Sequence, residues 1–556
     1  MPSTPAQANC LRAFSEALAD AGIAGAVLSP GSRSAPLILA LGTTEGITSH
    51  SVIDERTAGF FALGLGKAAQ RPAAVACTSG TAAANLAPSV HEAREAKTPL
   101  LVLTADRPPE LRAAGDNQTI DQIGVFGSAA KQLSPPSFSE DSIALWTQFA
   151  SECVEATLHP FPGPVHVNVP LWDPLAALPD EPATGTSIEA TPNFSPNEEK
   201  VDLPGGCTVV IAGRDEFGTD DELVGAADAL GIPVLPDPLS PASTSGSACV
   251  IAHWDSILRV EEWAAQHRPD VIVRTGDLPT SKPLRAWIKH CAEAGTEVIH
   301  FDPLNGGRDP DGINTAHLTG SLTTSLRESA RGDASWLADW VQADAKAAAA
   351  LEANRADQSE LTEPDLIHCI TNTMGSDETL FVAASMPIRD VESFGDLEGG
   401  PRTVANRGAN GIDGTIATAA GFATQSGQPL VLTLGDVTFA HDVASLAVLR
   451  EVRTPILVVV INNGGGAIFD NLPISERGDV YERFVFTPPR LNISHACAAW
   501  GIKHSSVESL KDIESLWSEV KADGSARVAE VVVRREASPL RRSSLRAAVS
   551  QALTSA

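Results

Sequence analysis

The chain has 556 residues, and because single hydrophobic cores rarely grow past about 250 residues, it is expected to form about three domains. Its 43% hydrophobic and 20% charged residues are typical of a globular protein. A formal net charge of −29 repels phosphate backbones and anionic membranes, and a single tyrosine among few aromatic residues leaves little for base stacking. Nucleic-acid and membrane partners are therefore disfavoured, and anionic substrates require a local concentration of positive charge.

The cysteine pattern and the apolar runs predict a cytoplasmic protein. The eight cysteines are scattered without a C-x-x-C pair, which indicates reduced, mostly buried thiols. The first ten residues lack the basic and apolar regions of a signal peptide. The longest strongly apolar run, Pro455–Ile461, is far shorter than the ~20 residues of a membrane span.

Short apolar runs alternate with helical spacing along three blocks of the chain. This pattern predicts an α/β fold of three successive doubly wound domains, each with a parallel sheet covered by helices on both faces. The expected domains are 1–180, 181–345 and 346–556. Strands are predicted at 26–28, 51–53, 74–77, 100–103, 165–169, 208–211, 233–235, 271–273, 298–301, 380–383, 430–434, 456–461 and 528–533. A Pro- and Thr-rich linker is expected at about 176–201, and an exposed alanine-rich helix at about 343–363.

In the first block, functional side chains follow the predicted strands. Residues 29–37 (SPGSRSAPL) open a helix, where backbone N–H groups with Ser32 and Arg33 suit an anion, since arginine holds a carboxylate bidentately. Glu55 ends the next strand and begins a helix of small residues. Asp54 and Glu55 also suit a purely structural role as first-turn acids at a helix N-terminus.

Two further segments of this block are rich in small or polar residues. Residues 77–85 (CTSGTAAAN) form a strand–loop–helix corner where a flat ring can lie against backbone, although small residues also simply pack a helix tightly onto a sheet. Residues 104–120 contribute the cation Arg107 and the amides Asn117 and Gln118.

The middle block lacks a G-x-G-x-x-G dinucleotide motif. Gly213 follows a strand, but charged residues succeed it where a dinucleotide loop needs glycines. We therefore predict a Rossmann-like domain that binds neither FAD nor NAD.

The third block contains one β-α-β unit with polar residues at both strand ends. A strand at 431–434 ends on Gly435 and Asp436, a helix is predicted at 442–453, and a strand at 455–461 ends on Asn462 and Asn463. A right-handed crossover makes the strands parallel, so Asp436 and Asn463 converge at the sheet edge where open α/β sheets bind ligands. A carboxylate, an amide oxygen and a loop carbonyl near Gly465 suit Mg²⁺ that keeps other positions for water and phosphate. The alternative is a helix-capping aspartate beside a polar loop.

The spacing from Gly435-Asp436 to Asn462-Asn463 resembles the diphosphate–metal motif of thiamine-diphosphate enzymes. Residues 29–36 (SPGSRSAP), 105–111 (ADRPPEL), 385–390 (SMPIRD) and 407–414 (RGANGIDG) narrow the match. Together these motifs resemble the 2-succinyl-5-enolpyruvyl-6-hydroxy-3-cyclohexene-1-carboxylate synthases of menaquinone biosynthesis. The resemblance covers the outer blocks nearly end to end and is loose in the middle block.

The resemblance implies a transferase that decarboxylates 2-oxoglutarate with thiamine diphosphate and Mg²⁺ (or Mn²⁺) and adds the succinyl unit to isochorismate. Glu55 is then the catalytic acid at the aminopyrimidine N1′, and Asp436, Asn463 and Gly465 bind the metal. The implied substrate-binding residues are Ser32, Arg33, Arg107, Asn117, Gln118, Lys282, Ser385, Arg389 and Arg407. The implied cofactor-binding residues are Glu55, Thr78, Gly80, Asn85, Ile412, Gly435, Asp436, Val437, Asn463, Gly465, Ile468, Phe469 and Leu472.

Two features remain open at this point. Pro283 follows Lys282 where the family places a second basic residue, which leaves the contribution of the middle domain unsettled. The rival functions are another thiamine-dependent 2-oxoacid decarboxylase or ligase, such as acetohydroxyacid synthase, and a non-catalytic thiamine-diphosphate-binding protein.

The resemblance further implies a homodimer with active sites shared between subunits, paired again into a homotetramer.

Overall fold

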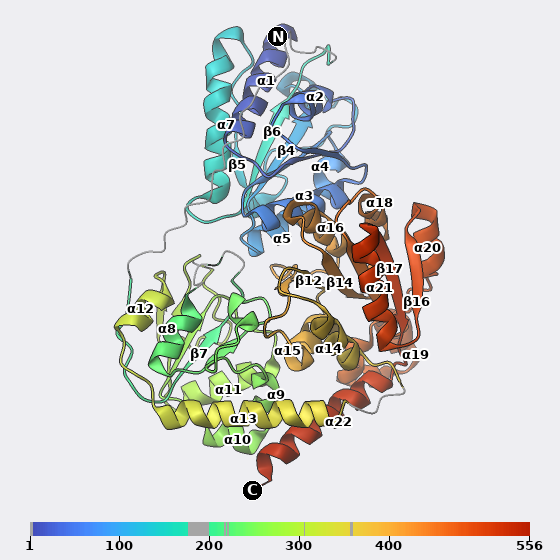
Figure 1. Ribbon diagram of the computed structural model, residues 1–556. Coiled ribbons are helices and arrows are strands. Elements are labelled where there is room, and N and C mark those ends of the chain that lie inside the picture. The colour runs from blue at the N-terminus through green and yellow to red at the C-terminus, as the bar shows by residue number, and fades with distance from the viewer. Residues whose placement is uncertain are drawn as a thin grey trace.

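The computed structural model describes residues 4–175, 199–215, 218, 222–304, 306–355 and 360–555. These residues form three α/β units, each built on one sheet whose paired strands are all parallel (Figure 1). This confirms the predicted fold class. The predicted linker at 176–201 falls almost entirely outside the described residues.

The first sheet has the strand order β2-β1-β3-β4-β6-β5. Its strands are β1 (Ala26–Leu28), β2 (Ser49–Ser51), β3 (Ala73–Cys77), β4 (Leu100–Asp106), β5 (Lys131–Leu133) and β6 (Pro164–Pro170). Its helices are α1 (Thr4–Asp20), α2 (Ala35–Thr43), α3 (Glu55–Ala69), α4 (Thr81–Asn85), α5 (Ala87–Glu95), α6 (Pro109–Ala113) and α7 (Ile143–Leu158). The central strands β3 and β4 are buried along their whole length, as expected for strands covered on both faces.

The middle sheet has the order β11-β10-β9-β7-β8. Its strands are β7 (Thr208–Ala212), β8 (Val234–Pro236), β9 (Val271–Thr275), β10 (Glu297–Phe301) and β11 (Ala316–Leu318). Its helices are α8 (Leu223–Leu230), α9 (Trp254–Leu258), α10 (Glu261–Gln266), α11 (Lys282–Glu293), α12 (Leu322–Glu328) and α13 (Ala334–Ala353).

The third sheet has the order β13-β12-β14-β15-β17-β16, which repeats the topology of the first sheet. Its strands are β12 (Thr379–Val382), β13 (Arg402–Val404), β14 (Leu430–Gly435), β15 (Ile456–Asn462), β16 (Lys503–Val507) and β17 (Ala526–Val532). Its helices are α14 (Glu363–Thr373), α15 (Met386–Phe394), α16 (Thr415–Ser426), α17 (Asp436–His441), α18 (Leu446–Leu449), α19 (Asp479–Tyr481), α20 (Ile493–Trp500), α21 (Leu510–Asp523) and α22 (Ala537–Thr554).

The two outer units pack on each other through α3 and α16. Both helices are rich in small residues, and a Cβ added at Gly64 would lie 2.2 Å from the Thr418 carbonyl oxygen. One added at Gly421 would lie 2.1 Å from the Phe61 carbonyl oxygen. Glycine is therefore required where the helix backbones cross, and the phenylalanines beside the crossing join both units into one hydrophobic core.

Three predictions of local structure need correction. The predicted strand 51–53 lies at Ser49–Ser51, so Glu55 is the first residue of α3 after a short loop. The predicted helix 442–453 is instead a 3₁₀ turn, Val443–Ser445, followed by the short α18. The alanine-rich helix expected at 343–363 is α13, which begins at Ala334 and buries one face.

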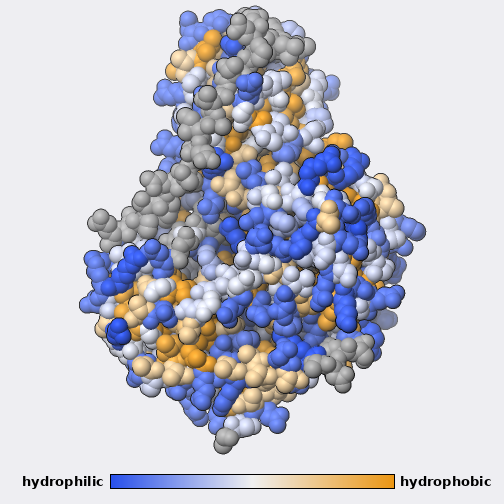
Figure 2. All heavy atoms as spheres, viewed as in Figure 1, coloured by the Kyte–Doolittle hydropathy of each residue, from blue (hydrophilic) through white to orange (hydrophobic). Residues whose placement is uncertain are grey.

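Helix α13 is held from both sides. Trp336, Trp340 and Ala347 on its inner face belong to the core of the middle unit, which also receives Leu545 and Val549 from α22. In Figure 2 a mildly hydrophobic band crosses the lower part of the molecule, in the region where Figure 1 shows α13. The C-terminal helix therefore connects the third unit to the middle one (Figure 1).

The cysteines are placed as their scattered spacing predicted. All eight cysteines are free, and every one but Cys207 is buried, as predicted. Among the described helices, none combines the length and apolar character needed to cross a bilayer.

Candidate active site

The carboxyl ends of β14 and β15 bring Asp436 and Asn463 into one cavity. The two strands pair in parallel with Gly435 opposite Ile461, so the residues that follow them leave the sheet at the same edge. Asp436 is the buried first residue of α17. The cavity, hereafter the third-unit cavity, has a volume of about 350 Å³.

Two oxygen atoms at this edge are buried without a hydrogen-bond partner among the described residues, Asp436 Oδ2 and Asn463 Oδ1. The other polar atoms of both side chains are engaged. Asp436 Oδ1 accepts a 2.9 Å hydrogen bond from the Val437 backbone N–H, and Asn463 Nδ2 donates to Glu363 Oε1 at 2.8 Å. Burying an oxygen without a hydrogen-bond partner costs free energy. These two, a carboxylate oxygen and an amide oxygen, are the kinds of ligand atom that a hard divalent cation prefers. The residues therefore fit a Mg²⁺ or Mn²⁺ ion.

Metal affinity is expected to depend on the protonation of Asp436. Burial raises the pKa of its carboxyl to about 6, although hydrogen bonds from the backbone N–H groups of Val437 and Gly464 lower it. Because a cation binds only the ionised form, affinity should be constant above this pKa and fall about tenfold per pH unit below it. Calorimetric Mg²⁺ titrations in the presence of thiamine diphosphate at pH 5–8 measure this. Asp436→Asn, which cannot ionise, should bind Mg²⁺ weakly at every pH and without this pH step, and a wild-type affinity unchanged down to pH 5 would contradict the assignment.

Most predicted residues of the third block line this cavity. In addition to Asp436 and Asn463, they are Ser385, Arg389, Arg407, Ile412, Gly435, Val437, Gly465, Ile468 and Phe469. Residue 465 must be glycine, because a Cβ at this position would lie 2.6 Å from the Phe486 carbonyl oxygen. The loop after β15 is therefore held against residue 486 on one side and opens to the cavity on the other.

A second cavity of about 380 Å³ adjoins the first and shares Met386, Arg389, Ile468 and Phe469 with it. Lys282, from the N-terminus of α11, and Leu472 line this adjoining cavity. Its other cations are Arg259, Arg542 and Arg546. The middle unit therefore contributes Lys282 beside the third-unit cavity.

The backbone at Ser385 is strained. This residue ends the loop after β12 with φ +77° and ψ −130°, a conformation that non-glycine residues rarely adopt. Asn410, another cavity residue, also has a positive φ of +62°. Such strain persists only where the surroundings hold it, and it is concentrated at functional sites.

Among the lining residues that were not predicted, the two with a charged or amide side chain are Glu363 and Asn410. Asn410 lies within the quoted motif at 407–414, so its sequence position was a usable signal. Glu363 begins α14 next to a proline and is typical of a first-turn acid, and no local pattern relates it to Asn463 one hundred residues later.

The predicted residues of the first block form a separate group at the carboxyl ends of β1, β3 and β4. Arg107 donates a short hydrogen bond to the Ser79 hydroxyl, and Gln118 Nε2 donates to the Ser79 carbonyl oxygen at 2.8 Å. A Cβ at Gly80 would lie 2.9 Å from Gln118 Cγ. Arg33 is tied by a hydrogen bond of 2.9 Å to the Leu171 carbonyl oxygen. The remaining members, Ser32, Thr78, Asn85 and Asn117, lie in the same loops or in α4.

Glu55 is partly exposed at the first turn of α3, whose N-cap is Asp54. Asp54 accepts the Thr57 backbone N–H at 2.8 Å, and Arg56 donates to the His441 carbonyl oxygen at 3.0 Å. Thus Asp54 has the capping role, whereas Glu55 is left without one. No residue of the first unit is among the described residues that line the third-unit cavity.

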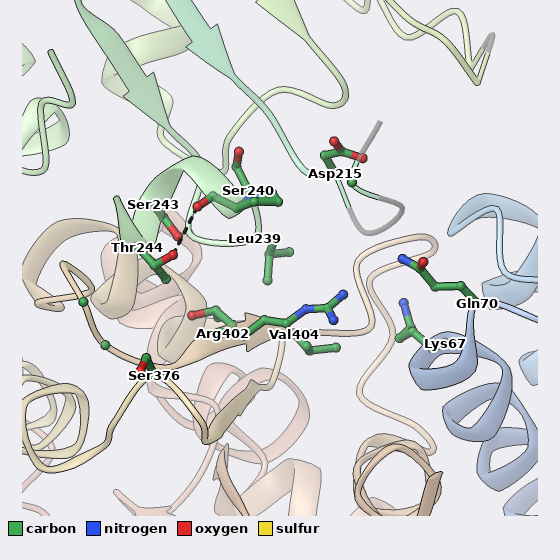
Figure 3. A pocket seen from close by; sticks show the side chains of 15 residues that line it. Lys67, Gln70, Asp215, Leu239, Ser240, Ser243, Thr244, Ser376, Arg402 and Val404 are labelled. Atoms are coloured by element: carbon green, nitrogen blue, oxygen red, sulfur yellow. Dashed lines mark hydrogen bonds between the residues drawn. The ribbon is translucent and has the colours of Figure 1, made fainter. Parts of the chain in front are cut away.

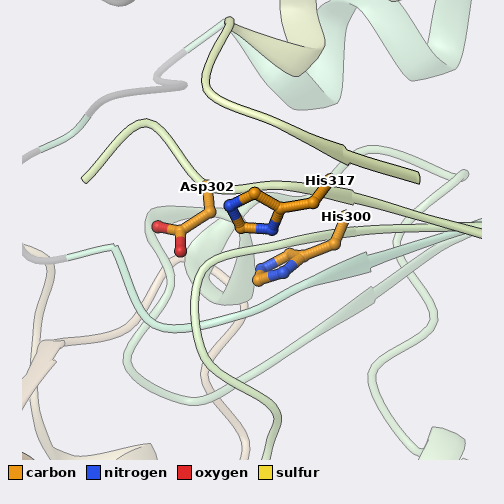
Figure 4. Close-up of side chains that lie close together, drawn as sticks. All are labelled: His300, Asp302 and His317. Carbon is orange, nitrogen blue, oxygen red and sulfur yellow. The ribbon is translucent and has the colours of Figure 1, made fainter. Parts of the chain in front are cut away.

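Two other polar regions, a cavity and a histidine cluster, lie outside the proposed cofactor and metal site. A cavity of about 460 Å³ lies where α3, β13 and the Ser240–Thr244 turn meet (Figure 3), and none of its described lining residues belongs to the predicted site. In the middle unit, His300, Asp302 and His317 lie close together (Figure 4). The His300 ring nitrogens already contact the Gly276 carbonyl oxygen at 2.9 Å and Arg274 Nη2 at 3.3 Å, and that guanidinium repels a cation. This cluster therefore does not suit a metal.

Three family models match successive parts of the chain. They are the N-terminal TPP-binding domain of thiamine pyrophosphate enzymes over residues 9–125, the middle domain over 190–382, and the C-terminal TPP-binding domain over 393–531. Among solved structures, benzoylformate decarboxylase from Polynucleobacter necessarius superimposes with a TM-score of 0.68. The superposition covers 95% of this chain and 98% of the decarboxylase chain at 16% sequence identity, which shows a shared fold.

Curated relatives match nearly the whole chain. The 2-succinyl-5-enolpyruvyl-6-hydroxy-3-cyclohexene-1-carboxylate synthase of Rubrobacter xylanophilus is 36% identical over 97% of both chains. The synthase of the same name from Geobacillus kaustophilus is 37% identical over 93% of this chain and 94% of its own. These matches confirm the predicted family, thiamine-diphosphate dependence and accompanying divalent metal. The chain belongs to the 2-succinyl-5-enolpyruvyl-6-hydroxy-3-cyclohexene-1-carboxylate synthase family of thiamine-diphosphate-dependent enzymes.

Proposed function

We propose that this enzyme decarboxylates 2-oxoglutarate and adds the resulting four-carbon unit to isochorismate, releasing CO₂, in menaquinone biosynthesis. The observation that carries the proposal is the grouping of Lys282, Arg389 and Arg407 around adjoining cavities that also hold the metal-ligand pair. Both substrates are dicarboxylates. In a chain of net charge −29, such a local group of cations is what their recognition requires.

The two arginines are positioned to receive carboxylates. Arg389 donates a short hydrogen bond to the Ser385 carbonyl oxygen, and Arg407 donates to the Thr280 hydroxyl at 2.8 Å. Burial lowers the pKa of both guanidinium groups, yet arginine stays charged in proteins. A desolvated cation is stabilised by an anion that it can hold through two hydrogen bonds. The unused donors of Arg389 and Arg407 are therefore assigned to substrate carboxylates.

The third unit supplies the metal and diphosphate half of the site. Asp436 Oδ2, Asn463 Oδ1 and the Gly465 carbonyl are assigned to the ion, and Gly435 and Val437 to the adjacent diphosphate. Ile412, Ile468, Phe469 and Leu472 provide apolar surface beside it. Such surface excludes water and strengthens electrostatic interactions at the reacting carbon. When bound, thiamine diphosphate supplies the carbon nucleophile that makes decarboxylation of a 2-oxoacid possible.

The first unit supplies the pyrimidine half. Glu55 is assigned to hold a proton at the aminopyrimidine N1′, and Thr78, Gly80 and Asn85 to line that ring. Ser32, Arg33, Arg107, Asn117 and Gln118 are assigned to the substrates. Since first-unit residues are absent from the described lining of the third-unit cavity, this half is contributed by a second copy of the chain.

Two exposed apolar side chains are consistent with this assembly. Ile53, two residues before Glu55, is 83% exposed in the single chain, and Phe484, two residues before Phe486, is 67% exposed. Because Ile53 is so near the proposed acid Glu55, a second chain that completes the site also covers Ile53. The proposed assembly is a homodimer with two shared active sites, paired again into a homotetramer.

Substrate choice is tested by measuring CO₂ release from 2-oxoglutarate with and without isochorismate, with pyruvate as the comparison substrate. We expect release from 2-oxoglutarate, sustained turnover only when isochorismate is present, and little release from pyruvate. Preference for pyruvate would overturn the proposed substrates and favour an acetohydroxyacid-synthase-like activity. Absence of turnover with any 2-oxoacid in cofactor-loaded protein would favour a non-catalytic role.

A further inference from the structure

A chain of three charged or polar side chains, two of them buried, leads from the C-terminal helix to the metal site. Arg542 of α22 forms a short ion pair with Glu363, the first residue of α14. Glu363 in turn accepts the 2.8 Å hydrogen bond from Asn463 Nδ2. Arg542 and Glu363 are 6% and 4% exposed, so water has little access to their ion pair.

The chemistry of the Glu363–Asn463 contact fixes which end of the amide faces the cavity. An asparagine amide presents an acceptor oxygen on one side and a donor NH₂ group on the other, and the two ends are nearly identical in shape. An ionised carboxylate only accepts hydrogen bonds. Glu363 therefore binds the NH₂ end, which leaves Oδ1 buried, unpaired and available to a cation. The opposite orientation would place N–H hydrogens toward the metal.

Glu363 is itself held in place on its far side. Arg542 binds Asp390 of α15 through two hydrogen bonds of 2.7 Å and 2.6 Å while it contacts Glu363. The Glu363 backbone N–H also donates to the Ser538 hydroxyl at 3.0 Å. With its carboxylate held by Arg542 and its backbone by α22, Glu363 cannot readily rotate away from Asn463.

We propose that Glu363 is a positioning residue that orients the Asn463 amide so that its oxygen, rather than its NH₂ group, is presented to the divalent metal. The inference rests on the proposed assignment of Asp436 and Asn463 as metal ligands. Residues in this outer position around a metal typically change its affinity 10–100-fold when they are replaced.

The test is a double-mutant cycle on metal affinity. Mn²⁺ binding to the full-length protein is measured by electron paramagnetic resonance at saturating thiamine diphosphate. Glu363→Ala and Glu363→Asp are each made in the wild-type background and in an Asn463→Asp background. Glu363→Asp keeps the charge beside Arg542 but withdraws the oxygen from Asn463. The Asn463→Asp side chain carries oxygens on both sides and needs no orientation.

In the wild-type background, both Glu363 variants are expected to weaken Mn²⁺ binding about 10–100-fold. In the Asn463→Asp background, the same changes should cost less than about threefold, because no amide remains to be oriented. Equal losses in both backgrounds would show that Glu363 acts only through its charge or through the fold, and would overturn the proposal, as would no loss in either. Thermal unfolding checks folding, and Asp390 keeps Arg542 paired in the Glu363→Ala variant.

The same assay separates this inference from the ligand assignment. If Asp436→Ala abolishes Mn²⁺ binding but the cycle shows no coupling, only the orienting role of Glu363 is wrong. If Asp436→Ala leaves Mn²⁺ binding unchanged, the metal site itself is elsewhere and both conclusions fail.

Discussion

Asp436→Ala is expected to abolish retention of thiamine diphosphate and its metal. Asp436 is the only charged side chain among the three proposed ligands, so without it the ion loses its main protein contact and the diphosphate is left unneutralised. Asn463→Ala removes a neutral ligand and should weaken binding less. Isothermal calorimetry with thiamine diphosphate and Mg²⁺ measures both effects.

Asp377→Ala is the matched control, because this exposed aspartate precedes β12 and thus lies at the opposite edge of the same sheet. It should bind the cofactor as wild type does. Unchanged affinity in Asp436→Ala would remove the carboxyl ends of β14 and β15 from the proposed site.

Glu55→Gln is expected to leave cofactor binding intact while turnover falls by more than the about 10²–10⁴-fold usual for acid–base groups. Glutamine preserves the size and hydrogen bonding of the side chain but cannot hold a transferable proton at N1′. Since activation of the cofactor precedes every turnover, the whole reaction slows. NMR exchange of the C2 proton of bound thiamine diphosphate measures this step directly.

The neighbouring acid provides the control for Glu55. Asp54 caps α3, and Asp54→Asn keeps a cap of similar strength, so its C2 exchange should be near normal. Near-normal exchange in Glu55→Gln would show that Glu55 is a structural first-turn acid.

Much of the fold follows from the sequence because the central strands are apolar and buried on both faces. β14 and β15 are hydrophobic over almost their whole length, so their positions and parallel pairing were predictable. The strands that were missed, β5, β11, β13 and β16, all lie at sheet edges. They are short or polar, as in the KHSSV sequence of β16, because an edge strand is only partly covered.

The site residues differ in the same way: those placed by one local motif were predictable, and those that depend on tertiary packing were not. Asp436 and Asn463 were predictable because a single β-α-β unit determines their convergence. Glu363 was not, because its relation to Asn463 depends on how α14 and α22 pack around the third sheet. The intervening helix was also mispredicted, since Asp442 receives the backbone N–H groups of Gly414 and Ile416 at a point where helical spacing would otherwise continue.

The central claim is that each active site combines the first unit of one chain with the third unit of another. Glu55→Gln subunits should be mixed with Asp436→Ala subunits, each inactive alone, and subunit exchange verified by native mass spectrometry. A heterodimer then contains one site with both defects and one intact site, so we expect up to about half of wild-type activity per heterodimer. A mixture that exchanges subunits but remains as inactive as either parent would contradict the shared site.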